Sequence, residues 1–283
     1  MGKRLSSRFI AGMTMEDALR VTEMVNCQGI AVTLDSLGER VSSESDAHRA
    51  ADSYHDLLDA IAARKLDANI SVKLSQMGLE QSPALAERIA ADLARHAHAT
   101  HNFVRIDMED SHLTQLTLDI VRRLHAQVEL RGAIGVVIQA YLFRSQADVE
   151  QLVADGIRVR LCKGAYSESP EVAFPHKADV DANFLRIARM LLDSPVYHAL
   201  ATHDEEMIEA TKDFAAEHGI GSSRFEFQML YGVRRDLQRK LIKDGYRVRV
   251  YVPFGPEWYP YFMRRLAERP ANLLFLTRNL IRF

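Results

Sequence analysis

The chain has 283 residues, 47% of them hydrophobic and 26% charged, and a formal net charge of −2 at pH 7. This composition is ordinary for a soluble globular protein, and the near-neutral charge gives no indication of a nucleic-acid partner. The two cysteines lack the spacing of metal ligands, and no apolar run is long enough to span a bilayer. We therefore expect a cytoplasmic protein without a metal site.

The first predicted element is a helix within residues 14–29. Thr14 and Asp17 have the spacing of a capping box, in which each side chain accepts a hydrogen bond from the other residue's backbone N–H. Gly29 is suited to end this helix, because glycine readily adopts the left-handed conformation that follows many helices. The pattern predicts one helix that leads into the rest of the fold.

Eight β-rich runs follow this helix, and amphipathic helical patterns lie between them. The runs begin at Ile30, Asn69, Asn102, Ala133, Ile157, Tyr197, Ser223 and Tyr246. Alternating strands and helices predict a parallel sheet, and eight strands in a chain of this size are typical of a (β/α)8 barrel. A doubly wound open sheet is the alternative, but no GxGxxG motif follows the first run.

The chain shows no internal boundary. No linker, low-complexity segment or shift in composition divides it. We therefore predict a single barrel domain over residues 1–283, with a lead-in helix in 1–29 and the barrel plus a C-terminal helix in 30–283.

Active sites of such barrels lie at the carboxyl ends of the strands, so polar residues there are candidates. Lys73, Asp107 and Arg160 fall inside runs that a parallel barrel would bury on both faces. Burying any of them without a partner would cost several kcal/mol, which is comparable to the whole free energy of unfolding of a protein. We expect them to pair with each other or with a ligand.

The predicted rim is cationic, which indicates an anionic ligand. Its cations are Lys73, Arg160, Lys163, Arg264 and Arg265. Arg264 and Arg265 lie in the last helical segment, where two interpretations are open. They form either a solvated charged face, with Glu268 one turn further on, or a fork of guanidinium groups that holds a carboxylate.

Two further patterns accompany the cations. The segment "KGAY" that begins at Lys163 is typical of a backbone loop that contacts a phosphate. Tyr166, Tyr251 and Tyr261 would either form walls around a small apolar ring or pack against the top of the barrel.

The residues alone leave other chemistries open. Lys73 or Lys163 would suit a Schiff-base aldolase or lyase acting on a small carboxylate. A non-catalytic barrel that binds an anion is a second alternative. A metal enzyme is a third, with ligands from Asp107, Glu109, Asp110 and His112.

The combined motifs resemble the proline dehydrogenase family, in particular its short monofunctional bacterial form. The resemblance is carried in order along the chain by "LDSLGE", "ISVKLSQMGL", "VRIDMEDS", "QAYLFR", "LCKGAY", "ATHD", "RFEFQMLYGVR" and "RVYVPFGPEWYPYFMRRLAERPANLLF". It implies a distorted (β/α)8 barrel with non-covalent FAD. It also implies oxidation of L-proline to Δ1-pyrroline-5-carboxylate, by hydride transfer from C5 to FAD N5, as the first step of proline catabolism.

The resemblance also implies roles for individual residues. The catalytic residues would be Asp107, beneath the substrate, and Arg160, near flavin N5. The substrate would be bound by Lys73, Arg264, Arg265, Tyr166, Leu230, Tyr251 and Tyr261. The cofactor would be bound by Met108, Gln139, Arg160, Lys163, Gly164, Ala165, Thr202 and His203. Glu39 would pair with Arg264 as a gate.

Finally, the resemblance implies partners beyond L-proline. Electrons would pass to a quinone, with peripheral contact at the inner face of the membrane. The product would be handed on to pyrroline-5-carboxylate dehydrogenase.

Overall fold

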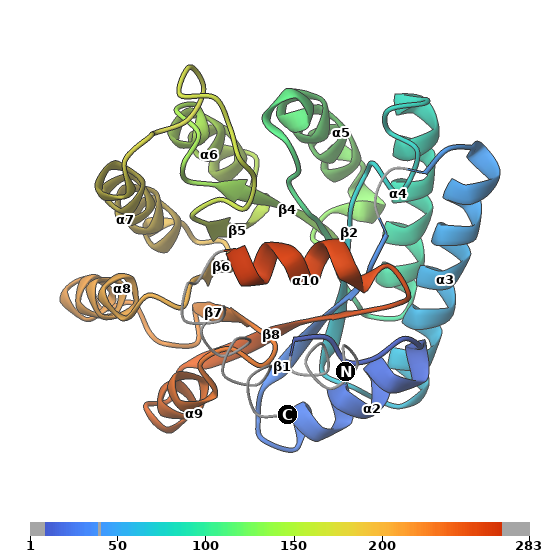
Figure 1. The fold of residues 1–283 in the computed structure, drawn as a ribbon. Coiled ribbons are helices and arrows are strands. Elements are labelled where there is room, and N and C mark those ends of the chain that lie inside the picture. The colour runs from blue at the N-terminus through green and yellow to red at the C-terminus, as the bar shows by residue number, and fades with distance from the viewer. Residues whose placement is uncertain (1–8, 39–40, 268–283) are drawn as a thin grey trace, which may run out of the picture.

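The computed structural model describes residues 9–38 and 41–267, and its centre is a closed barrel of eight parallel strands (Figure 1). Each strand pairs with the next along the chain, and β8 pairs with β1. The strands are β1 (Ala31–Ser36), β2 (Ala68–Val72), β3 (Val104–Ile106), β4 (Ile134–Gln139), β5 (Arg158–Cys162), β6 (His198–Ala201), β7 (Phe225–Leu230) and β8 (Arg247–Phe254). The predicted (β/α)8 barrel is confirmed, and the doubly wound alternative is wrong.

Helices alternate with the strands and surround the barrel (Figure 1). They are α2 (Met15–Asn26), α3 (Glu44–Ala63), α4 (Pro83–Ala99), α5 (Thr114–Ala126), α6 (Ser145–Ala154), α7 (Lys177–Asp193), α8 (Glu205–Glu217), α9 (Arg235–Lys243) and α10 (Trp258–Ala267). Two short 3-10 turns, η1 (Ser111–Leu113) and η2 (Val128–Leu130), flank α5.

The lead-in helix α2 begins where the sequence predicts. The Thr14 hydroxyl accepts a hydrogen bond from the backbone N–H of Asp17, and the Asp17 carboxylate accepts one from the backbone N–H of Thr14. The predicted capping box is thus confirmed. Gly29 follows the helix with φ of +72°, a conformation that suits glycine. The helix packs beside β1 and β8.

Helix α10 departs from the ring formed by the other helices. In Figure 1 it crosses in front of the barrel instead of standing at its outer wall. Its Tyr261 packs with Ile10 and with Leu37, the residue that follows β1. Because Leu37 lies just beyond the carboxyl end of β1, α10 reaches the end of the barrel where active sites form.

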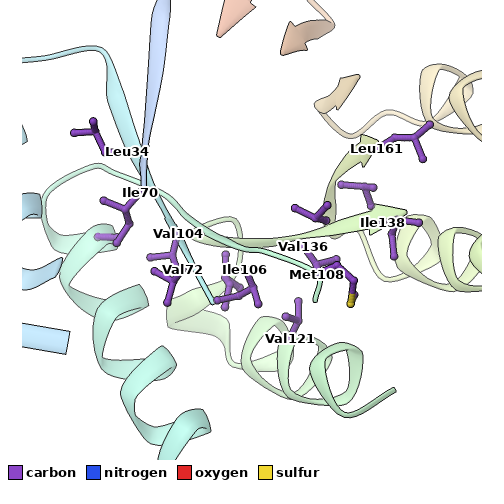
Figure 2. Close-up of a cluster of buried hydrophobic side chains, with 14 of the residues drawn as sticks. Leu34, Ile70, Val72, Val104, Ile106, Met108, Val121, Val136, Ile138 and Leu161 are labelled. Carbon is purple, nitrogen blue, oxygen red and sulfur yellow. The ribbon is translucent and has the colours of Figure 1, made fainter. Parts of the chain in front are cut away.

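Apolar side chains fill the space between the strands and the outer helices. Figure 2 shows Leu34, Ile70, Val72, Val104, Ile106, Met108, Val121, Val136, Ile138 and Leu161 in this layer. Except for Val121, which lies on α5, they occupy alternate positions along β1 to β5 and just beyond β3, because successive side chains of a strand point to opposite faces. The alternate positions face the interior of the barrel, and many of them are polar and buried: Thr33, Asp35, Asn69, Ser71, Arg105, Arg160, Glu226 and Gln228.

Candidate active site

Asp107 is the centre of a buried cluster at the carboxyl end of β3. Its Oδ1 accepts hydrogen bonds from Arg160 Nη1 at 2.9 Å and from Ser71 Oγ at 2.5 Å. Its Oδ2 accepts one from the Tyr251 hydroxyl at 2.9 Å. The expectation that buried Asp107 pairs with a cation is confirmed, and the two residues predicted to be catalytic are in direct contact.

Tyr251 links this cluster to the last strand. Burial first, and then the Asp107 carboxylate, raise the pKa of Tyr251 well above its ordinary value. The hydroxyl therefore stays protonated and donates to Asp107 across the physiological range. The Arg160 guanidinium lies 5.4 Å from the centre of the Tyr251 ring, within the range of a cation–π contact.

Lys73 directly follows β2 and pairs with Asp35, which lies on the neighbouring strand β1. Its Nζ lies 3.1 Å and 3.0 Å from the two carboxylate oxygens of Asp35, and both side chains are buried. Burial alone would lower the pKa of Lys73, but the Asp35 carboxylate, aided by Asp107, raises it above the ordinary value. Lys73 is therefore a fixed positive charge.

Gln139, at the end of β4, holds two neighbouring loops together. Its Nε2 donates to the backbone carbonyl of Glu109 at 3.0 Å. Its Oε1 accepts from the backbone N–H of Ala165, also at 3.0 Å. The side chain thus fixes the start of the "KGAY" loop above β5.

Gly164, in the same loop, approaches an aromatic ring too closely for any side chain. It has φ of +145°, and a Cβ at this position would lie 2.5 Å from the Tyr141 ring. The Tyr141 hydroxyl is buried and has no hydrogen-bond partner among the described residues. The buried Tyr141 hydroxyl without a partner fits a site that accepts a further polar group.

Lys163 lies in a compact group of opposite charges at the end of β5. Its Nζ contacts the carboxylates of Asp181, on α7, and Asp204, the latter at 2.7 Å. Lys177 contacts the same two carboxylates. Lys163 thus lies beside the Gly164 loop, with its charge paired to two carboxylates.

The remaining residues predicted to contact the cofactor lie around β6 and β7. Thr202 Oγ1 accepts from the backbone N–H of Asp204 at 3.1 Å. His203 Nε2 accepts from the backbone N–H of Leu230 at 2.9 Å, so a neutral His203 carries its proton on Nδ1. Met108 is buried in the apolar layer outside the strands.

The predicted aromatic walls are only partly brought together. Tyr251 touches Asp107, and Tyr166 is near enough to Lys73 to influence the pKa of that lysine. Tyr261, on α10, is buried against Ile10 and Leu37.

Three predicted residues cannot be placed at this site. Arg264 and Arg265 belong to α10, but their side chains lie outside what the structure describes. Glu39 also lies outside the described residues. The carboxylate clamp and the gate therefore stay predictions.

Two observations concern the metal-enzyme alternative and the Schiff-base alternative at Lys73. Over residues 9–38 and 41–267, no group of three or more His, Cys, Asp or Glu side chains is arranged to hold a metal ion. A Schiff-base mechanism needs a neutral lysine, whereas Asp35 raises the pKa of Lys73 and keeps it charged.

Sequence reasoning missed the roles of three buried polar residues. No sequence-based prediction above gives a role to Asp35, Gln228 or Ser71. Ser71 lies on β2, two positions before Lys73, which directly follows that strand. The period of two that directs both side chains inward could therefore have identified Ser71.

A closed parallel barrel whose strand ends bring together charged and aromatic side chains defines the class of (β/α)8-barrel enzymes. The family model described as proline dehydrogenase matches residues 18–278. The chain therefore belongs to the proline dehydrogenase family, and it is an oxidoreductase.

Individual relatives agree with this placement. Proline dehydrogenase 1 of Bacillus subtilis subsp. natto is 43% identical over 282 residues, which cover 99% of this chain and 92% of that protein. Proline dehydrogenase of Deinococcus radiodurans is 40% identical over 283 residues, 98% of this chain and 90% of that protein.

The fold of the chain also matches a solved structure. The crystal structure of proline utilization A (PutA) from Bdellovibrio bacteriovorus, inactivated by N-propargylglycine, superposes with a TM-score of 0.89 at 28% identity. The match covers 94% of this chain but only 32% of the PutA chain. The present chain thus corresponds to about a third of that larger protein.

Proposed function

We propose that this chain oxidises L-proline to Δ1-pyrroline-5-carboxylate with FAD as cofactor and a quinone as electron acceptor. The observation that carries the proposal is the buried contact of Asp107 with Arg160 and Tyr251, beside the Lys73–Asp35 pair. Such fixed charges and donors at the carboxyl ends of the strands suit a small zwitterionic substrate, because its carboxylate and amine carry opposite charges.

The substrate carboxylate is held by cations in this proposal. Lys73, kept charged by Asp35, provides one of them. The adjacent arginines of α10, Arg264 and Arg265, provide a fork that binds a carboxylate through parallel hydrogen bonds. Leu230, Tyr166, Tyr251 and Tyr261 limit the space around the ring, and Glu39 closes the site by pairing with Arg264.

Residues at the same end of the barrel would hold the cofactor. Lys163, the backbone of Gly164 and Ala165, Thr202 and His203 form a donor set that suits the diphosphate of FAD. FAD, when bound, supplies the acceptor at N5 for the hydride that leaves C5 of proline. Arg160 adds positive charge near that position, while its contacts with Asp107 and Ser71 keep it in place.

The proposal also includes an electron acceptor and an enzyme that uses the product. Electrons leave to a membrane quinone through peripheral contact with the bilayer. No helix among the described residues is both long and apolar enough to cross a membrane. The product is a substrate for pyrroline-5-carboxylate dehydrogenase.

Substitution of the two α10 arginines tests the proposed clamp. In Arg264→Met and Arg265→Met, L-proline KM should rise by about 10-fold to 100-fold, because charge-assisted hydrogen bonds of about 1.5–3 kcal/mol are lost. The ratio of flavin to protein should stay at the wild-type value. A variant that instead loses its flavin, with KM unchanged once FAD is restored, would assign the arginine to the cofactor.

A trapping experiment distinguishes the main alternative. Under the proposal, borohydride treatment in the presence of a small oxo acid such as pyruvate leaves the mass of the polypeptide unchanged. A covalent adduct on Lys73 or Lys163 would favour a Schiff-base aldolase or lyase instead.

A further inference from the structure

Gln228 lies between two charged groups in the interior of the barrel. Its Oε1 accepts a hydrogen bond from Arg160 Nε at 2.5 Å, and its Nε2 donates one to Glu226 Oε1 at 2.5 Å. A guanidinium only donates and a carboxylate only accepts. The Gln228 amide can therefore satisfy both neighbours in one orientation only, with its oxygen toward Arg160.

Glu226 is a fixed negative charge beneath this amide. It accepts hydrogen bonds from Arg249 Nε at 2.8 Å and from the Tyr197 hydroxyl at 3.0 Å. Burial alone would raise the pKa of Glu226, but Arg249 outweighs burial and lowers it. The carboxylate thus stays ionised and keeps the Gln228 amide in its single orientation.

Arg160 is held at all three of its nitrogen atoms. Nη1 donates to Asp107 at 2.9 Å and to Ser71 at 3.1 Å, and Nη2 donates to Thr33 at 3.3 Å. Gln228 provides the partner of Nε. Asp107, Ser71 and Thr33 bind the two terminal Nη atoms of the guanidinium. Gln228 binds Nε, the nitrogen next to the aliphatic chain, and its oxygen is therefore the acceptor that fixes the rotation of the guanidinium about that chain.

We propose that Glu226 is a positioning residue that sets the orientation of Arg160 through the Gln228 amide. The inference rests on the proposed function, in which Arg160 lies beside the reacting atoms. Glu226 itself touches neither substrate nor cofactor in this scheme. If its charge is removed, the Gln228 amide has two acceptable orientations, and in one of them it presents N–H groups to a guanidinium that needs an acceptor.

A double-mutant cycle tests whether Glu226 acts through Gln228. The variants are Glu226→Gln, Gln228→Met and their combination, each purified with FAD bound. The measured quantity is the rate constant for anaerobic flavin reduction at saturating L-proline. Each single variant should reduce it by about 10-fold to 100-fold, the loss expected when a group beside the reacting atoms is misplaced by about 1 Å. The double variant should lose no more than either single variant.

Tyr197→Phe is the matched control. It removes one hydrogen bond from Glu226 but keeps the carboxylate, Arg249 and the orientation of Gln228. We expect its rate constant for flavin reduction to equal the wild-type value. If Glu226→Gln does not fold, Glu226→Asp replaces it in the cycle, because the shorter side chain keeps the charge but draws it away from Gln228.

The outcomes separate this inference from the proposed function. Unchanged flavin reduction in Glu226→Gln, or independent losses that multiply in the double variant, would overturn the positioning role. Losses that multiply in this way would mean that Glu226 and Gln228 act independently, so that Glu226 only stabilises the barrel. A wild-type protein whose flavin is not reduced by L-proline would contradict the proposed function itself.

Discussion

Lys73 and Asp35 form a buried ion pair in which each charge depends on the other. The two carboxylate oxygens of Asp35 lie 3.0 Å and 3.1 Å from Lys73 Nζ. Removing one member of such a pair leaves an uncompensated charge in a medium of low polarity, which costs more than the pair contributes. The pair therefore matters for stability as well as for the proposed binding of a carboxylate.

In Asp35→Asn, we expect the free energy of unfolding to fall by about 3–5 kcal/mol, because the Lys73 ammonium loses its buried partner. Urea unfolding at pH 7 measures this change. Glu87→Gln is the control, since it breaks the exposed pair between Glu87 and Arg123 and should cost at most about 1 kcal/mol. Equal effects of the two substitutions would show that the Lys73–Asp35 pair is not buried as described.

At this scale the sequence predicts which residues need partners but not which partners they find. Burial of Lys73, Asp107 and Arg160 follows from the strand pattern alone. The strand pattern leaves open whether Asp107 pairs with Lys73, with Arg160 or with a ligand, and the barrel pairs it with Arg160. The partner of Asp107 depends on which side chains meet across the closed interior of the barrel. The local sequence does not determine these contacts.

The loop after β5 shows how a single element combines backbone and side-chain requirements. Gly164 leaves no room for a Cβ against the Tyr141 ring, while Gln139 fixes the neighbouring Ala165. Any side chain at residue 164 must displace either the ring or the loop. In the proposed function, this loop contributes to the FAD site.

In Gly164→Ala, we expect FAD affinity to fall about tenfold, because the displaced loop stores about 1–3 kcal/mol of strain. Titration of the apoprotein with FAD, followed by flavin fluorescence, measures the dissociation constant. Gly156→Ala is the matched control, since Gly156 also has a positive φ, +75°, but a Cβ there would meet no atom within 4 Å. Wild-type affinity in Gly164→Ala would remove this loop from the FAD site.

His198, on β6, connects two strands in a way that depends on pH. Its Nδ1 accepts a hydrogen bond from the backbone N–H of Val159 at 3.0 Å, which requires a deprotonated Nδ1. Burial first, and then Arg105 and Arg158, lower the pKa of His198 from 6.5 to about 3. At a pH between these two pKa values, His198 binds a proton in the unfolded chain but not in the folded protein.

The free energy of unfolding should therefore decrease as the pH falls from 6.5 toward 3, and the contribution of His198 should be complete above pH 6.5. In His198→Asn, the amide oxygen still accepts from Val159 but does not titrate. Between pH 6.5 and 5, we expect the wild type to lose about 2 kcal/mol more than this variant in urea unfolding. Parallel pH dependences would contradict the lowered pKa.

Secondary-structure elements were largely predictable for a physical reason. Apolar residues at every second strand position and amphipathic helices between the strands specify a barrel, since each helix must bury its apolar face against the sheet. The position of α10 at the mouth of the barrel does not follow from its helical pattern alone. Its amphipathic pattern fits packing at the outer wall equally well, and only contacts such as that of Tyr261 with Leu37 distinguish the two positions.

The whole molecule places a polar interior inside an apolar shell. The outward strand positions pack against the helices, as Figure 2 shows, whereas the inward positions form hydrogen bonds that run from Asp107 through Arg160 and Gln228 to Glu226. One continuous barrel positions both ends of this network. The single-domain organisation over residues 1–283 and the membrane contact stay predictions.

The most direct test of the central claim is the visible absorption spectrum of the purified protein under anaerobic conditions. The account predicts a bound flavin whose absorption near 450 nm, about the usual position for an oxidised flavin, is lost on addition of L-proline and retained with D-proline. A protein that binds FAD but keeps its spectrum with L-proline, or that loses it equally with both enantiomers, would contradict the account.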